Sequence, residues 1–475
     1  YEISECLVGS EMCIRDSSTI LISCFTMYNF LYDVSKKREI AILGAVIYAF
    51  IPYRLETIFN RFAIGEFTAY IFFPMLFHGL FNLLKGDGKK HYYIAIAAIG
   101  LILTHTISTE YSAIFALLYI VFNFKQLKNK GVIRKIAINV IFILAITTFF
   151  TVPLMEHKIL GNYVIFNSKS MKSLPSDVQN STIKISQLFK DIGEVNGVSF
   201  KVGIPLIILT LLGIVSYKKV DKNIRSWYIT FAVIAMISLV MVTKLFPWII
   251  MPKTLTTLQF AWRMLAYSEF ALSIICAINL YYFIEYIGRN NEKVYNALFA
   301  LSIILIIVSM AKINYNYNYE ENKNITDEGY EAHLNEKNSI WSINREYLPE
   351  RVDTKALGKS YLDHRDDRVY VLDGNATITN EKKEDLQLEF DIEDYEAYTI
   401  LELPYIYYLG YTVTTEQNEK IQMFESDNGM LAIKLDENIE SAHITVKYTG
   451  TTIEKVSYFI SAISLSLIHI SEPTR

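Results

Sequence analysis

Apolar stretches close to the length that crosses a lipid bilayer recur through the chain, separated by short polar loops. They cover residues 18–32, 40–53, 67–84, 92–103, 112–124, 136–154, 202–217, 227–242, 264–287 and 294–310, and another begins near Val456. A straight helical span needs about 20 apolar residues, so we expect the shorter helices to end inside a protein-lined cavity. The pattern predicts an α-helical polytopic membrane protein with at least eleven helices.

Composition agrees with a membrane location. Of the 475 residues, 52% are hydrophobic and 20% are charged, and the mean hydropathy of +0.25 is high for a soluble protein. The 45 Lys and Arg residues are balanced by 49 Asp and Glu residues, which argues against nucleic-acid binding through a basic surface. The sequence contains no phosphate-binding loop motif and no zinc-hydrolase motif, so we identify no cofactor. The question whether the protein uses a divalent metal stays open.

The two ends of the chain do not look like natural protein. Residues 465–475 (LSLIHISEPTR) and 7–17 (LVGSEMCIRDS) translate one sequencing-adaptor DNA and its reverse complement. We therefore expect 1–17 and 465–475 to be adaptor-encoded and the natural protein to continue beyond both. The alternative is a natural, Cys-bearing amphipathic start. The other two cysteines, Cys24 and Cys276, lie in apolar runs, so the polar part cannot depend on a disulfide.

Basic residues in alternate short loops predict the orientation of the helices. Seventeen Lys and Arg residues fall in every second loop: Lys36, Lys37, Arg38, Lys85, Lys89, Lys90, Lys125, Lys128, Lys130, Arg134, Lys135, Lys218, Lys219, Lys222, Arg225, Arg289 and Lys293. Cytoplasmic loops carry such an excess. The intervening loops, and the polar stretch that ends at Lys455, are therefore expected outside the cytoplasm of a bacterial cell.

The same polar stretch divides into two parts. Residues 313–367 have few aliphatic side chains and are expected to form a linker. From 368 to 455 the pattern has a period of two, with seven short runs separated by turn formers, which predicts a β-sandwich. The multi-helix membrane domain then covers 18–312, and 456–464 begins a final transmembrane helix. Tyr405, Tyr407, Tyr408 and Tyr411 are expected at one end of the sandwich, either as a sugar-binding surface or as a contact with the membrane part.

Three outer corners of the helices carry polar groups at one membrane depth. The first, residues 52–74, holds Arg61 and Glu66; the second, 104–111, holds His105 and Glu110; the third, 258–269, holds Gln259 and Arg263. Each corner has an ordinary interpretation alone: an ion pair that locks a hairpin, a structural histidine, and an arginine that snorkels. Together they predict a site for a lipid-linked phosphate, because guanidinium groups bind phosphate oxygens in bidentate fashion.

Several of these segments resemble a known family. PYRLETIFNRFAIGEFTAYIFFP, LILTHTIS, LQFAWRML, WSINREYLP, ELPYIYYLGYTV and YTGTT resemble bacterial polytopic membrane proteins described as 6-pyruvoyl-tetrahydropterin synthase-related, and the YfhO-like proteins close to them. The resemblance covers nearly all of 18–464. It implies a GT-C-like membrane fold that transfers a sugar from a polyprenyl-phosphate donor to a cell-envelope acceptor. The catalytic Asp of that superfamily lies in the first outer loop, which we expect upstream of this chain, so no catalytic residue is assigned.

Two functional hypotheses follow. The first is a glycosyltransferase-like protein of the bacterial cell membrane, whose partners are membrane lipids, a polyprenyl-phosphate-linked sugar and a cell-envelope polymer. Here Arg61, Arg263 and His105 hold the phosphate and Glu66 orients Arg61, with Glu110 and Gln259 further out. The alternative is a non-enzymatic lipid-carrier translocator or envelope-assembly protein. Inverted repeats among the helices would favour a transporter.

Overall fold

The computed structural model describes residues 2–59, 61, 63–167, 174–189, 194–195, 198–199, 201–315, 347–353, 365–417, 419–435 and 442–471. The chain is mostly helical, and its longer β-strands lie near the C-terminal end. It divides into two compact units, Tyr1–Thr147 with Ser173–Glu320 and Thr148–Lys172 with Glu321–Arg475. The prediction of a helical part followed by a β-rich part is confirmed.

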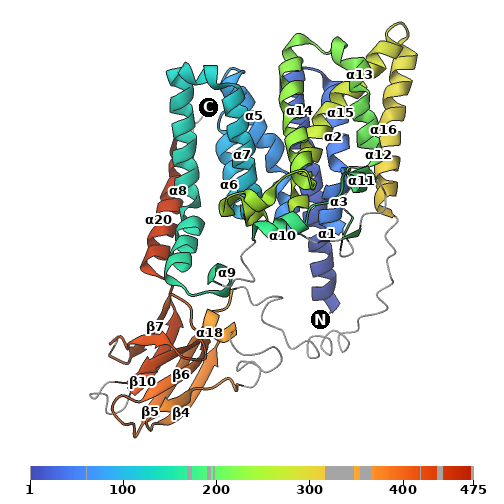
Figure 1. Cartoon of the computed structure of the whole chain (residues 1–475). Helices are drawn as coiled ribbons and strands as arrows, with labels where there is room; N and C mark the ends of the chain where they lie inside the picture. Colours follow the sequence, from blue (N-terminus) through green and yellow to red (C-terminus); the bar gives the residue numbers. More distant parts are fainter. Residues whose placement is uncertain are drawn as a thin grey trace. The chain divides into compact units, whose positions relative to one another are not determined.

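Each apolar stretch of the first unit lies on one or two helices (Figure 1). These helices are α1 (Glu2–Ser35), α2 (Arg38–Ala49), α3 (Pro52–Phe59), α4 (Ile64–Ala69), α5 (Phe72–Leu84), α6 (Tyr93–Thr104), α7 (Thr106–Phe122), α12 (Ile204–Leu211), α13 (Gly213–Ser216), α14 (Lys222–Val242), α15 (Leu265–Gly288) and α16 (Glu292–Tyr315). Helix α8 (Lys130–Leu160) belongs to both units. Short elements of the first unit are α10 (Pro175–Asn180), α11 (Ile185–Phe189), strands β1 (Glu194–Val195) and β2 (Val198–Ser199), and the 3-10 helices η1 (Phe124–Lys128), η2 (Tyr217–Lys219), η3 (Trp248–Ile250), η4 (Lys253–Leu258) and η5 (Ala261–Met264).

Five helical segments among the described residues are long and apolar enough to cross a membrane. They are Ile64–Leu84, Lys130–Leu160, Lys222–Val242, Ala261–Gly288 and Glu292–Ser309, and α2 with α3, bent by 43°, would make a sixth. Helices α6 and α7 are apolar but shorter. Several apolar helices are therefore present, while the expected number of eleven crossings stays a prediction.

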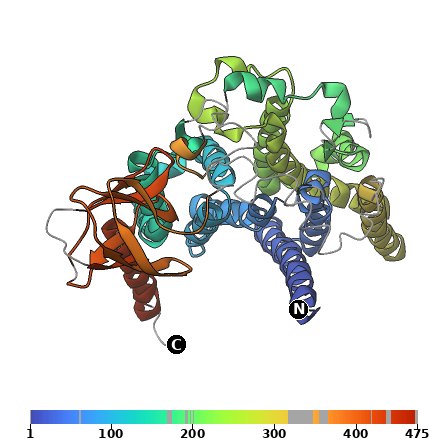
Figure 2. The same cartoon turned by 90° about the horizontal axis from the view of Figure 1, so that it is seen from below.

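Helix α15 is the centre of the helical unit. It packs against α2, α12, α14 and α16, and its side chains are buried on every face from Leu265 to Tyr282. A helix that is apolar all round has no face to turn toward water, so it is buried by its neighbours. In the view from below, these four helices lie next to it (Figure 2).

The β-rich part forms two four-stranded antiparallel sheets. One has the order β4-β5-β10-β7 and the other β3-β6-β9-β8. The strands are β3 (Tyr370–Asp373), β4 (Thr377–Glu384), β5 (Gln387–Glu393), β6 (Ile400–Ile406), β7 (Tyr411–Thr415), β8 (Met423–Glu425), β9 (Met430–Lys434) and β10 (Ala442–Tyr448). Leu388 and Phe390 of one sheet share a buried core with Leu401 and Leu403 of the other. Two sheets around one core are the arrangement of a β-sandwich.

Two details of the sandwich differ from the sequence prediction. The period of two in residues 386–390 predicts Leu386 in the core beside Leu388 and Phe390, but 55% of Leu386 is exposed, because it lies in the turn between β4 and β5 where the strand alternation has not begun. Strand β8 was not predicted, since three residues are too few to establish a period of two. The buried positions of β5 otherwise alternate as expected.

The second unit also contains α9 (Val164–Asn167), α18 (Glu350–Asp353) and α20 (Thr452–Ser471), and α20 leaves the sandwich as a separate helix (Figures 1 and 2). The side-chain hydroxyl of Ser461 accepts a hydrogen bond of 3.0 Å from the backbone N–H of Phe149, which joins α20 to the part of α8 that belongs to the same unit. Helix α1 begins at Glu2 and α20 ends at Ser471. The described parts of the peptides expected to be adaptor-encoded thus extend neighbouring helices.

Candidate functional site

The first corner is a tight connection between α3 and α4. Pro52 opens α3, a position where its missing N–H costs nothing. After α3 ends, the N–H of Arg61 donates to the carbonyl of Glu56 at 3.0 Å and the N–H of Ala63 donates to the carbonyl of Thr57 at 3.0 Å. These bonds fold the chain back so that Arg61 and Glu66 face each other.

Glu66 is the centre of the cluster that results. Only 3% of it is exposed. Its Oε2 lies 3.0 Å from Nη1 of Arg61 and 3.8 Å from Nε of Arg263. Its Oε1 accepts a short hydrogen bond from the hydroxyl of Tyr53, and that hydroxyl accepts one of 2.8 Å from Nη1 of Arg61. One carboxylate therefore faces two guanidinium groups that come from distant parts of the sequence.

The second corner, between α6 and α7, is held by His105. Its Nδ1 accepts a hydrogen bond of 3.2 Å from the backbone N–H of Ser108 and lies 2.8 Å from the hydroxyl of the same residue. The imidazole thus caps the N-terminus of α7. Because a backbone N–H can only donate, Nδ1 must be unprotonated, so the neutral ring carries its proton on Nε2.

The ring of His105 belongs to the same cluster as Glu66. A small pocket is lined by both residues together with Ser108, Arg263 and Tyr267. Burial lowers the pKa of His105 below its usual value; the negative charge of Glu66 opposes this shift, while the positive charges of Arg263 and Arg61 reinforce it. His105 is therefore neutral at neutral pH and offers an Nε2–H donor.

The third corner brings Arg263 in through η5. Nη1 of Arg263 donates to the carbonyl of Leu258 at 3.1 Å and to Oε1 of Gln259 at 2.9 Å. The ring of Trp262 packs beside the first corner, with Cζ of Arg61 4.4 Å from its centroid. The loop therefore supplies an arginine and an aromatic ring to one cluster.

The six residues predicted from the sequence fall into three groups. Arg61, Glu66, His105 and Arg263 come together, and Gln259 is attached through its bond to Arg263. Glu110 lies apart: its Oε2 accepts a hydrogen bond of 2.5 Å from Thr257 and joins α7 to η4. The structure thus gathers all three corners, while binding of a phosphate there stays a prediction.

Tyr53, Ser108, Trp262 and Tyr267 also belong to the cluster and were not predicted. Tyr53 precedes Arg61 by eight residues and meets it only because the chain turns back after α3. The hydroxyl of Tyr267 donates to the carbonyl of Ser108 at 2.8 Å. Aromatic residues are so frequent at the ends of apolar helices that their type alone did not separate them from interface anchors.

Arg54 lies outside the cluster although it belongs to the first corner. It is fully buried, and its guanidinium carbon lies 5.3 Å from the ring of Tyr48 and 5.4 Å from that of Tyr70. Nη2 donates to the hydroxyl of Ser23 at 2.5 Å and Nη1 to the carbonyl of Tyr48 at 3.2 Å. Arg54 therefore ties α1, α2 and α3 together.

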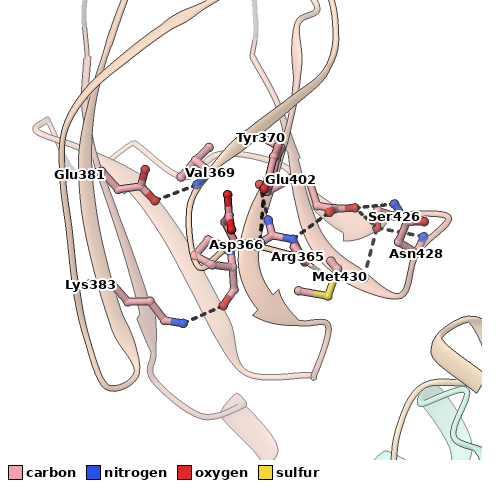
Figure 3. A network of polar contacts seen from close by, with 11 residues as sticks. Arg365, Asp366, Val369, Tyr370, Glu381, Lys383, Glu402, Ser426, Asn428 and Met430 are labelled. Atoms are coloured by element: carbon pink, nitrogen blue, oxygen red, sulfur yellow. Dashed lines mark hydrogen bonds and ion pairs between the residues drawn. The ribbon is translucent and has the colours of Figure 1, made fainter. Parts of the chain in front are cut away.

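A second polar network lies inside the sandwich (Figure 3). Glu402, which is fully buried, accepts from Nε of Arg365 at 3.2 Å, from the hydroxyl of Ser426 at 2.7 Å and from the amide of Asn428 at 3.1 Å. Arg365 also donates to the carbonyls of Asp366 and Glu402. Both oxygens of Glu402 accept hydrogen bonds from protein donors, so the network ties parts of the sandwich together.

The tyrosines of the sandwich gather at one end. The rings of Tyr405 and Tyr411 lie 5.2 Å apart, and Tyr408 stacks at 5.8 Å on Tyr163, which follows α8. These contacts join the sandwich to the α8–α9 segment of the same unit. The contact with the membrane part and the sugar-binding role both stay predictions.

Among the described residues, no group of three or more His, Cys, Asp or Glu side chains is arranged to hold a metal ion. No family model, curated protein or solved structure matches the chain. The chemistry of the site therefore has to be argued from the cluster itself.

Proposed function

We propose that the chain is a multi-pass bacterial membrane protein that binds the phosphate of a polyprenyl-phosphate-linked sugar at the cluster of Arg61, Glu66, His105 and Arg263, and passes the sugar to a cell-envelope acceptor. The observation that carries this proposal is the charge balance of the cluster. Two guanidinium groups share one buried carboxylate, so the side chains of Arg61, Arg263 and Glu66 together carry one positive charge in excess. Such a charge in a partly desolvated place is stabilised by an anion.

Hydrogen-bond donors that remain unused support the same proposal. Within the described chain, nothing accepts from Nη2 of Arg61, from Nη2 of Arg263 or from Nε2 of His105. Nε of Arg263 is buried, and no described residue accepts a hydrogen bond from it. A phosphate offers several strong acceptor oxygens, whereas a carboxylate offers two, so a phosphate suits this set of donors.

The position of the cluster supports an extracytoplasmic site. In Figure 1 the turn between α15 and α16, which carries Arg289 and Lys293, lies at the opposite end of the helical unit from α3. Arg61 follows the end of α3. If the loops rich in Lys and Arg are cytoplasmic, the cluster opens on the other side of the membrane, where cell-envelope polymers are assembled.

Binding of undecaprenyl phosphate to the purified full chain in nanodiscs tests the proposal. Arg61→Lys and Arg263→Lys keep the charge but lose the bidentate fork. Each should weaken binding about 10-fold or more, because hydrogen bonds to charged groups contribute about 1.5–3 kcal/mol. Arg289→Lys, at the other end of the unit, is the matched control. Unchanged binding in both cluster variants would reduce the two arginines to structural anchors.

Sugar transfer is tested separately from binding. Incubation with a radiolabelled undecaprenyl-phosphate-linked hexose and cell-envelope fragments should release undecaprenyl phosphate and label the polymer. Binding without any transfer, together with movement of the lipid across the bilayer of vesicles, would instead support a translocator.

A further inference from the structure

Phe260 and Trp262 form a stacked pair of rings beside the arginine cluster. Their centroids lie 4.9 Å apart and their planes differ by 10°. Trp262 is nearly buried, with 7% of it exposed, while 42% of Phe260 is exposed. Phe260 is therefore the outer, accessible ring of the pair, and Trp262 is the inner, covered ring.

The two arginines contact this stack differently. Cζ of Arg61 lies 4.4 Å from the centroid of Trp262, and within the described chain Arg61 makes no such contact with Phe260. Cζ of Arg263 lies 5.4 Å from Phe260 and 5.8 Å from Trp262. Since the two rings are 4.9 Å apart, these nearly equal distances place Arg263 at the edge of the stack. Among the described residues, no ring or cation is stacked on the outer face of Phe260.

A strained turn holds Phe260 in this position. Gln259 has φ 65° and ψ −45°, and the N–H of Phe260 donates to the carbonyl of Leu258 at 2.7 Å. This is the γ-turn with positive φ, which is rare and strained. A non-glycine residue in such a conformation is strained, and strain of this kind is typical of functional sites. The side chain of Gln259 in turn accepts from Arg263, so one turn fixes both the ring and the guanidinium group.

We propose that the free face of Phe260 is the platform on which the sugar ring of the lipid-linked donor stacks, with the adjoining phosphate held by Arg263 at the edge of the stack. The proposal rests on the proposed function and adds the part of the site that recognises the sugar. The C–H face of a pyranose is apolar and slightly positive, so it is attracted to the negative face of an aromatic ring. A hexose with equatorial hydroxyls, such as glucose, presents the flattest face of this kind.

The test compares two kinds of lipid on the full chain in nanodiscs: undecaprenyl phosphate alone, and undecaprenyl phosphate joined to glucose, galactose or mannose. The wild-type chain should bind at least one hexose form more tightly than the bare lipid. Phe260→Leu, which keeps an apolar side chain but loses the ring, should reduce this preference roughly threefold to tenfold. Phe260→Tyr should retain it, and Phe122→Leu, at another exposed phenylalanine of the same unit, is the control.

The outcomes separate the two proposals. If the wild-type chain binds no hexose form better than the bare lipid, or if Phe260→Leu and Phe260→Tyr show the same preference, the platform is wrong while the phosphate site stands. If neither lipid binds, or if Arg61→Lys and Arg263→Lys bind the bare lipid as the wild type does, the phosphate site itself fails.

Discussion

The carboxylate of Glu66 interacts with Arg61, with Arg263 and with the hydroxyl of Tyr53. It therefore competes with any anion for the same two guanidinium groups. In Glu66→Gln the charge excess of the cluster rises from one to two, because the shape is kept and the negative charge is lost. Breaking a buried pair costs about 3 kcal/mol, so the variant should unfold at a lower temperature in phosphate-free buffer. Added inorganic phosphate should raise its unfolding temperature more than that of the wild type.

Thermal unfolding in detergent, with and without phosphate, measures both effects. Glu110→Gln is the matched control, because within the described chain the Glu110 carboxylate forms a hydrogen bond only with Thr257. A Glu66→Gln chain that is as stable as the wild type and indifferent to phosphate would show that the cluster does not attract anions.

Gly65 allows two corners to approach each other. A Cβ atom at this position would lie 2.4 Å from the carbonyl oxygen of Thr104 and 3.5 Å from the ring of His105. Gly65→Ala should therefore push α4 away from the α6–α7 corner, lower the free energy of unfolding by about 1–3 kcal/mol and weaken binding of undecaprenyl phosphate. Gly131→Ala is the control, since the nearest atom there is the end of the flexible Asn129 side chain. Equal binding in both variants would contradict the need for this close approach.

At the scale of elements, His105 has two roles that substitution can separate. Its Nδ1 caps α7, and within the described residues nothing accepts from its Nε2–H. Asparagine is among the best N-cap residues, so His105→Asn should keep the stability of the corner but weaken lipid-phosphate binding. His105→Ala should weaken binding and also cost about 1 kcal/mol of stability. Unfolding curves and binding isotherms of the two variants check this. If His105→Asn bound the lipid phosphate as well as the wild type does, capping of α7 would be the only role left for His105.

The buried ion pair between Arg365 and Glu402 in the sandwich leads to a prediction about stability. In Glu402→Gln one amide N–H group must face either Arg365 or the donors Ser426 and Asn428 (Figure 3). A buried donor that faces another donor has no acceptor, so the substitution should lower the free energy of unfolding of the sandwich by about 3 kcal/mol. Glu384→Gln removes an exposed charge beside Lys382 and should change little. Chemical denaturation of the full chain, followed by circular dichroism in the β region, distinguishes the two.

The sequence predicted the elements better than their contacts. Period-two alternation identified β5 because each buried residue has a polar neighbour, and apolar runs identified the helices. The three corners were recognisable because ionised side chains next to apolar helices need a partner or a cavity. The meeting of Tyr53 with Arg61, the place of Arg54 between two tyrosines, and the stack of Phe260 on Trp262 depend on how helices pack. No local pattern carries that information.

At the scale of the whole molecule, the site depends on which ends of the helices face outward. The orientation rests on Lys and Arg in alternate loops, and single cysteines in a background without Cys6, Cys13, Cys24 and Cys276 can test it. Asp427 and Lys128 are both exposed in the structure. In intact cells an impermeant maleimide should label Asp427→Cys, and it should label Lys128→Cys only after the membrane is opened. The reverse pattern would put the loops rich in Lys and Arg outside and the arginine cluster on the cytoplasmic side, where the proposed transfer to a cell-envelope polymer could not occur.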